Sequence, residues 1–297
     1  MTPVREFLTD LAALSLGGGA VALVLMLTAR FTHARYAARW RCWIWLLLCL
    51  RLAIPVQFLP DRPAQQAPIQ LPAVEDRVVL RPAAPPAASS GDLSQPPAPS
   101  TPSPSASEET APSPVQAPPL SFSLSASQLL FLLWLLGAVG VLAWNLLAHL
   151  RFCRYLARWS TAVQDPDTLS LYNTLGDQLG LDRRPRLLSC PGLAVPMLAG
   201  LFRPALLLPA EPPAGDELRF SLLHELTHYR RGDIFRKTLA LWVRAVHWFN
   251  PLVWLTARTM DRDIELACDE SALKRLPPEE HAAYGRTILS AISALRG

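Results

Sequence analysis

Charged side chains are scarce in this sequence. Asp, Glu, Lys and Arg make up 18% of the 297 residues and hydrophobic residues 51%, whereas a soluble domain usually contains about a quarter charged residues. This deficit indicates that lipid surrounds part of the chain. The net charge is only +4, and the basic residues stand beside apolar segments, so direct nucleic-acid binding is not expected.

Paired cysteine motifs are also absent. The five cysteines are scattered, odd in number and include no CxxC pair. This pattern argues against a disulfide framework and against a cysteine-rich zinc knuckle, and it predicts reduced thiols. The five are Cys42, Cys49, Cys153, Cys190 and Cys268.

Three apolar segments are long enough to cross a bilayer, which takes about 20 helical residues. We expect transmembrane helices over residues 7–29, 42–59 and 127–149. No region of small polar residues that would suit signal-peptide cleavage follows the first segment, so a membrane helix is favoured there. The sequence therefore predicts an α-helical membrane anchor of three transmembrane helices.

Basic residues set the expected orientation of this anchor. They follow the first and third segments without nearby acidic residues, which by the positive-inside rule places both regions in the cytoplasm. The N-terminus and residues 60–126 are then extracytoplasmic. The latter stretch contains 16 of the 29 prolines and is expected to be disordered. The basic residues are Arg30, Arg35, Arg39, Arg41, Arg151, Arg154 and Arg158.

The domain organisation follows from these segments. Residues 1–59 hold two transmembrane helices and a basic cytoplasmic loop, residues 60–126 the Pro-rich loop, and residues 127–149 the third helix. Residues 150–297 form a cytoplasmic domain large enough to bury a core. For this domain we expect helices at 165–180, 216–230 (with Asp216 as N-cap), 261–273 and 278–295, and short strands between 186 and 209. Residues 238–257 form one apolar, Trp-rich segment, which is expected to be either a core helix or a helix lying against the membrane.

One helix of this domain carries a metal-binding pattern. His224 and His228 are four residues apart, so their imidazoles lie on one helical face and can bind one ion. Zinc hydrolases take three protein ligands and leave a fourth position for water. Glu225, beside the first histidine, suits the general base that accepts a proton from that water. The alternative is two histidines placed by chance on a core or surface helix.

A third ligand must come from another element. Glu265 is the best candidate, since Asp269 shares its helical face and could orient a zinc-bound histidine through the free ring N–H. Alternatively, both carboxylates belong to an acidic face paired with Arg258 and Arg262. Cys268 is a poorer ligand candidate because it only partly shares that face.

Two further polar residues keep two interpretations each. Asp233 either supports a histidine ligand or forms a salt bridge with Arg230 or Arg236. His247 either stabilises an oxyanion or is structural, and the second is favoured. The pattern assigns no role to Tyr284.

Longer motifs make the sequence similar to a known family. The segments 224–233 (HELTHYRRGD), 248–254 (WFNPLVW) and 263–270 (DIELACDE) resemble the BlaR–MecR type of membrane metallopeptidase. The resemblance implies an α+β gluzincin-type domain with Zn²⁺ on His224, His228 and Glu265, and with Glu225 catalytic. It also implies that residues near Pro196–Pro209 form a sheet edge that receives the substrate as an added strand.

The resemblance also implies a biological setting. It is a bacterial plasma membrane, with the lipid bilayer as one partner and a cytoplasmic protein substrate as the other. That substrate would be a DNA-binding repressor, and the chain itself is a second candidate. Two alternatives remain, a quality-control protease for membrane proteins and a non-catalytic receptor or scaffold. The intact Glu225 disfavours the second.

The sequence departs from the best-known members of this family in one respect. Those β-lactam sensor-transducers continue into a fourth membrane helix and an extracellular penicillin-binding domain with Ser-x-x-Lys chemistry. The only Ser-x-x-Lys here is Ser271–Lys274, on the side predicted to be cytoplasmic. We therefore do not expect antibiotic sensing from these 297 residues. They are either part of a longer protein or a member that senses through its Pro-rich loop or a partner.

Overall fold

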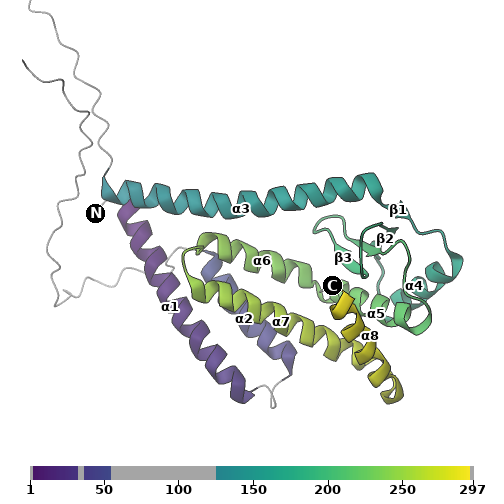
Figure 1. The fold of residues 1–297 in the computed structure, drawn as a ribbon. Helices are drawn as coiled ribbons and strands as arrows, with labels where there is room; N and C mark the ends of the chain where they lie inside the picture. Colours follow the sequence, from purple (N-terminus) through teal and green to yellow (C-terminus); the bar gives the residue numbers. More distant parts are fainter. Residues whose placement is uncertain (1–2, 33–36, 55–124, 295–297) are drawn as a thin grey trace, which may run out of the picture.

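The fold combines long helices with one small sheet (Figure 1). The computed structural model describes residues 3–32, 37–54 and 125–294. The Pro-rich loop predicted at 60–126 lies almost wholly outside the described residues, so its disorder stays a prediction.

Three helices correspond to the predicted transmembrane segments: α1 (Pro3–Thr32), α2 (Ala38–Ala53) and α3 (Ala126–Trp159). In the described part of the chain, α1 and α3 are long and apolar enough to cross a membrane. α2 has 16 residues and is shorter than the roughly 20 that a span needs. It starts before the predicted residue 42, and residues 55–59 of that predicted span are not described.

The beginnings of α1 and α3 lie at the same end of the molecule (Figure 1). Phe7 packs edge-on against Phe131 and Trp134, with ring centroids 5.8 and 5.1 Å apart. α3 continues ten residues past the predicted end at residue 149 and delivers the chain to the sheet at the opposite end.

The sheet has four strands in the order β1-β2-β4-β3. They are β1 (Thr161–Ala162), β2 (Arg186–Ser189), β3 (Met197–Ala199) and β4 (Ala205–Leu208). β2 and β4 are parallel, whereas β1 and β3 pair antiparallel to them and form the two edges. The strands expected between residues 186 and 209 are therefore confirmed, and one of them, β3, is an edge strand.

Helices α4 (Pro166–Gln178), α5 (Gly215–Arg231) and α8 (His281–Ala294, after the 3₁₀ turn Pro278–Glu280) pack with the sheet around one core. Asp165 caps α4 by accepting a hydrogen bond from the Thr168 N–H. The prediction of Asp216 as the N-cap of α5 is wrong, since α5 follows Ala214 without a side-chain cap. Asp216 lies in the first turn, where its charge still favours the helix dipole.

The apolar segment at 238–257 is not a single helix. It belongs to α6 (Asp233–Val246) and α7 (Pro251–Leu273), which form a hairpin whose tip is residues 247–250. Asn250 accepts a hydrogen bond from the Leu252 N–H and caps α7. Pro251 follows as the first helical residue, where its missing N–H costs nothing.

The hairpin shares a second core with α1 and α2, and a buried polar cluster fixes this contact. Arg41 pairs with Asp263 of α7 at 3.0 Å, and the indole N–H of Trp45 donates to the other Asp263 oxygen at 2.7 Å. Asp263 is 2% exposed, so the two donors from α2 compensate its buried charge.

We expect Asp263→Ala to destabilise the fold by about 3–5 kcal/mol, because it removes the carboxylate that pairs with the buried Arg41. Thermal unfolding of the purified protein in detergent, followed by tryptophan fluorescence, measures the change. Arg262→Ala is the matched control: it is adjacent and exposed, and should shift stability by less than about 0.5 kcal/mol. Equal unfolding midpoints for Asp263→Ala and wild type would contradict the prediction.

Candidate metal centre

The two histidines of α5 converge as their spacing predicts. The Nε2 atoms of His224 and His228 are 3.1 Å apart, and their rings stand nearly perpendicular at 82°. His228 is buried, while His224 is partly exposed. The apolar side of α5, with Leu222, Leu223 and Leu226, is buried in the core and fixes the direction of both imidazoles.

Glu265 of α7 completes a cluster of three donor atoms. Its Oε2 lies 3.1 Å from His228 Nε2 and 3.6 Å from His224 Nε2. Its Oε1 accepts a hydrogen bond from the Lys237 ammonium at 2.9 Å. Lys237 therefore leaves one oxygen of Glu265 directed at the histidines. The alternative pairing with Arg258 and Arg262 is not among the ion pairs of the described residues.

This geometry fits a zinc ion. Zinc bonds to nitrogen and oxygen of about 2.0–2.2 Å place neighbouring ligand atoms of a tetrahedral site roughly 3.3 Å apart. The three observed separations are 3.1, 3.1 and 3.6 Å. The three side chains could thus hold one zinc ion and leave a fourth position open.

Cys268 is a second neighbour of the cluster, and its sulfur lies with the two histidines within 4.8 Å. However, the thiol is 3.9 Å from Nδ1 of His224, the opposite side of the ring from Nε2, and it donates to the His224 carbonyl. Glu265 faces both Nε2 atoms and is the better third ligand on geometry.

Asp233 holds His228 from behind. Its Oδ2 lies 2.8 Å from His228 Nδ1 and accepts a hydrogen bond from Arg231 Nε, while its other oxygen pairs with Arg236. Gly232 makes this return possible, because it ends α5 at φ 66°, a left-handed conformation that favours glycine. Both interpretations of Asp233 therefore hold together, with Arg231 in place of Arg230.

Asp269 and Tyr284 hold His224 in the same way. Asp269 Oδ1 lies 3.2 Å and the Tyr284 hydroxyl 2.9 Å from His224 Nδ1, and Tyr284 donates to Asp269 at 2.8 Å. With Nδ1 engaged as a donor, the lone pair of Nε2 is free for a metal. Tyr284 comes from α8, sixty residues from His224, so no local sequence pattern could have indicated its role.

Glu225 lies between the histidine helix and the edge of the sheet. Its Oε2 accepts a hydrogen bond from the backbone N–H of Leu198, in edge strand β3, at 2.7 Å. The carboxylate is therefore placed where a chain extending beside β3 would pass.

Residues 9–297 match the family described as BlaR1 peptidase M56. The chain belongs to this family. It is 30% identical over 176 residues to the Regulatory protein BlaR1 of Bacillus licheniformis, an alignment that covers 57% of this chain and 29% of that protein.

Two Methicillin resistance mecR1 proteins are further relatives of this M56 peptidase. Those of Staphylococcus aureus (strain Mu50 / ATCC 700699) and Staphylococcus epidermidis are each 35% identical over 97 residues, covering 32% of this chain and 17% of theirs. The chain thus aligns with less than a third of the length of these relatives.

The charges of this M56 site control its proton affinity. Burial opposes protonation of the imidazoles, but the hydrogen bond to Asp269 raises the pKa of His224, and hydrogen bonds to Asp233, Cys268 and Glu265 raise that of His228 to about 11. Burial also opposes ionisation of Glu265, yet the two histidines hold its pKa well below the usual value. Ligating imidazoles are neutral, so a divalent cation that binds here must displace protons.

The pKa of Glu225 is shifted in the opposite direction from that of Glu265. Burial raises its pKa above the usual value, although the two histidines and the Leu198 N–H oppose this effect. A carboxylate with a raised pKa is better suited to accept and return a proton than an ordinary one.

Two residues singled out from the sequence lie elsewhere or serve the fold. His247 is fully buried at the hairpin tip, at the far end of α6 from the cluster, with Nε2 3.1 Å from the Leu52 carbonyl. It is structural. Ser271, of the Ser-x-x-Lys match, donates to the Ala267 carbonyl and accepts from Arg231. Its hydroxyl thus joins α5 to α7.

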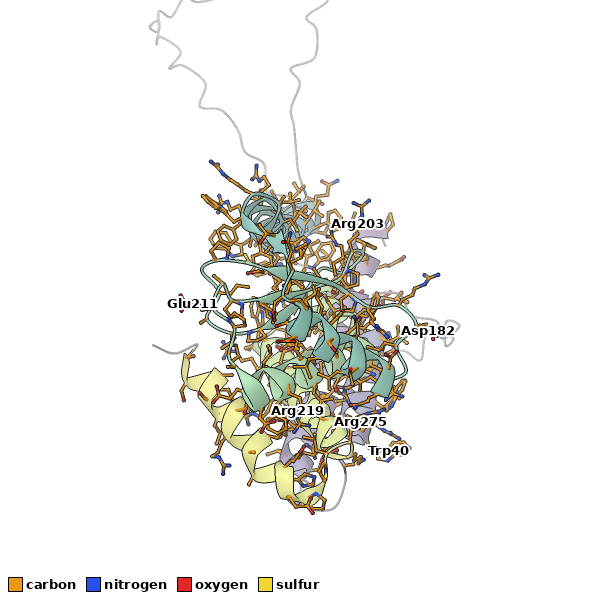
Figure 2. The ribbon with its side chains drawn as sticks, turned by 90° about the vertical axis from the view of Figure 1, so that its right-hand side faces the viewer. Trp40, Asp182, Arg203, Glu211, Arg219 and Arg275 are labelled. Carbon is orange, nitrogen blue, oxygen red and sulfur yellow. The ribbon has the colours of Figure 1, made fainter. Side chains whose placement is uncertain are left out.

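A groove of about 1010 Å³ adjoins Glu225 through Leu198. Four of its arginines are exposed, and the aromatic rings of Phe202 and Phe235 lie among them. Asp182 is the one acidic side chain among its described lining residues. Figure 2 shows Arg203 and Asp182 on the same side of the domain, opposite Glu211. The exposed arginines are Arg183, Arg186, Arg203 and Arg230.

We expect Tyr284→Phe to weaken zinc binding about tenfold, because loss of a partner that orients a ligating histidine typically costs 10- to 100-fold in affinity. Competition with a chelating dye measures this affinity. Tyr229→Phe is the control: this tyrosine lies next to His228 in α5, but its hydroxyl has no hydrogen bond to the cluster. Unchanged zinc affinity in Tyr284→Phe would show that Asp269 orients His224 alone.

Proposed function

We propose that this M56 peptidase is a membrane-anchored zinc endopeptidase of the gluzincin type that cleaves a cytoplasmic protein. The observation that carries the proposal is the convergence of His224 Nε2, His228 Nε2 and Glu265 Oε2 within 3.6 Å, next to the half-buried Glu225. A scaffold without catalysis would need the three ligands but not a carboxylate facing the sheet edge.

Each residue then has one task. His224, His228 and Glu265 hold zinc, while Asp269 with Tyr284, and Asp233, orient the two imidazoles. Zinc, when bound, supplies a Lewis acid that polarises the scissile carbonyl and makes water more acidic. Glu225 accepts the proton of the attacking water and returns it to the leaving nitrogen.

The substrate is proposed to lie along β3 as an added strand. The Leu198 N–H, which now donates to Glu225, is at the free edge of that strand and would donate to the peptide instead. Substrate binding would thereby release the Glu225 carboxylate for proton transfer. Past β3 the same peptide enters the arginine-lined groove, which favours acidic residues on one side of the scissile bond.

The membrane part of the proposal rests on the placement of three helices. α1 and α3 start at one end of the molecule, and the sheet and metal centre lie at the other (Figure 1). Arg151, Arg154 and Arg158 follow the apolar part of α3 at that second end. With α2 as the return crossing, the N-terminus and residues 60–126 are outside, and the metal centre is in the cytoplasm of a bacterium.

The relatives favour signalling over quality control. One is named a regulatory protein and the others methicillin resistance proteins, so a transcriptional repressor is the first substrate to test, and the chain itself the second. A gene for a small DNA-binding repressor beside the gene for this chain would support this choice. Its absence would favour general clearance of membrane proteins.

Glu225→Ala should keep zinc but lower cleavage by about 10²- to 10⁴-fold, the usual contribution of a general base. Coexpression with the candidate repressor, read by immunoblot, measures cleavage, and metal analysis of the purified protein measures zinc. Glu265→Ala is the counterpart and should lose zinc as well as activity. Normal cleavage by Glu225→Ala would refute the mechanism, and full zinc content in Glu265→Ala would move the third ligand to another residue such as Cys268.

The arginines of the groove predict a preference for substrates with acidic residues, which charge-reversing substitutions should weaken. The double variant Arg183→Glu, Arg203→Glu should lower kcat/KM about tenfold for peptides with acidic residues on one side of the cleavage site, since each exposed ion pair contributes up to about 1 kcal/mol. Neutral peptides should be cleaved as before, and high salt should remove the difference. Arg286→Glu on α8, also exposed, is the control. An equal loss for both peptide classes would disprove the preference.

A further inference from the structure

The tip of the α6–α7 hairpin lies between the helices of the membrane anchor. Asn250 donates to the carbonyl and hydroxyl oxygens of Ser15 in α1, at 3.0 and 2.9 Å. Trp134 in α3 donates from its indole to the Val246 carbonyl at 2.8 Å, and Trp248 donates to the Trp134 carbonyl at 3.1 Å. Both membrane helices therefore contact the tip well inside their apolar segments.

Helix lengths give the depth of the tip. Ser15 precedes the expected cytoplasmic end of the first span, Ala29, by fourteen residues, and Trp134 precedes that of the third, His149, by fifteen. At 1.5 Å per residue each interval is about 21–23 Å of helix, out of a hydrocarbon core about 30 Å thick. The fourteen residues from Pro251 to Glu265 span about 21 Å as well. The tip is thus deep in the apolar layer while the metal centre is at its edge.

Side chains, rather than water, satisfy backbone groups at this depth. The last carbonyls of α2 have no partner within their own helix. Trp242 donates to the Ala53 carbonyl at 3.0 Å, and His247 Nε2 lies 3.1 Å from the Leu52 carbonyl. Such pairing is needed where no water reaches the backbone.

Glycines in α1 and α3 allow the hairpin to pack closely against these helices. The indole of Trp248 fills the position that a Cβ on Gly137 of α3 would occupy, at 2.2–2.5 Å. A Cβ on Gly19 of α1 would meet Leu252 and Asn250 at 3.1 and 3.3 Å. Glycines at such contacts are typical of helices that associate inside membranes.

We propose that α6 and α7 form a re-entrant hairpin that enters the bilayer from the side of the metal centre, and that its outer surface binds lipid acyl chains. Trp242, Phe249 and Leu255 form this surface and are 46, 45 and 46% exposed. The proposal rests on the membrane orientation proposed above but not on catalysis. Two basic residues of the hairpin must be accommodated in this membrane placement. Arg244 stacks on the Trp254 ring at 4.3 Å, and the long side chain of Arg258 can extend toward the membrane–water boundary.

A nitroxide label placed on single cysteines tests the proposal in proteoliposomes. The background is Glu225→Ala with Cys153→Ser, which prevents proteolysis and removes the exposed native cysteine. Probes at Phe249→Cys and Leu255→Cys report on the hairpin. Phe202→Cys, 92% exposed in the groove, is the matched aqueous site, and Leu136→Cys, 71% exposed in α3, is the matched lipid site.

Collision rates with oxygen and with a water-soluble nickel chelate are compared at each site. We expect the oxygen-to-nickel ratio at Phe249→Cys and Leu255→Cys to match Leu136→Cys and to exceed Phe202→Cys by about tenfold, because the chelate is excluded from hydrocarbon. High nickel access at the hairpin, or low access for both reagents, would overturn the proposal. If the nickel chelate also reaches Leu136→Cys, the proposed membrane orientation is wrong. If the protein proves not to be a peptidase, the label results are unaffected, because they are measured in the Glu225→Ala background.

Discussion

Three donor atoms on two separate helices must meet within a few ångströms, and this requirement makes the placement of α7 decisive. On one side α5 contacts α7 through Arg231, which donates to the Ala267 carbonyl and to Ser271. On the other side α2 contacts α7 through Arg41, Trp45 and the buried Asp263. Glu265 lies between these two contacts of α7. The position of its carboxylate relative to the histidines therefore depends on both α5 and α2.

The carboxylates around the cluster differ in burial and in the number of their cationic partners. Asp233 is buried and in contact with Arg231 and Arg236, whereas Glu265 pairs with the exposed Lys237. Both imidazoles are thus held at Nδ1 by carboxylates, whereas Glu265, the proposed third ligand, has more freedom. A cation that enters the site would therefore meet a rigid pair of nitrogens and one adjustable oxygen.

The sequence predicted the local part of the site and missed its long-range part. The spacing of His224 and His228 sets their geometry within one helix, so it could be inferred directly, and Glu265 became specific only through the family resemblance. Tyr284 and the Leu198 N–H arrive from distant elements, and their roles depend on tertiary packing. The hairpin was missed for another reason. Its two helices are apolar on both sides of the tip, so hydrophobicity alone showed one continuous segment, although Asn250 and Pro251 mark the start of α7.

The end of α2 is held by the indole of Trp242 in α6 and by the imidazole of His247 at the hairpin tip. In the proposed re-entrant hairpin these two hydrogen bonds lie in the bilayer, where no water would replace a lost partner. α2 therefore cannot slide along α6 by small steps, as helices joined only by packing can. Tension applied to the chain beyond Ala53 would therefore act on α6 and on the hairpin tip, which leads into α7 and Glu265.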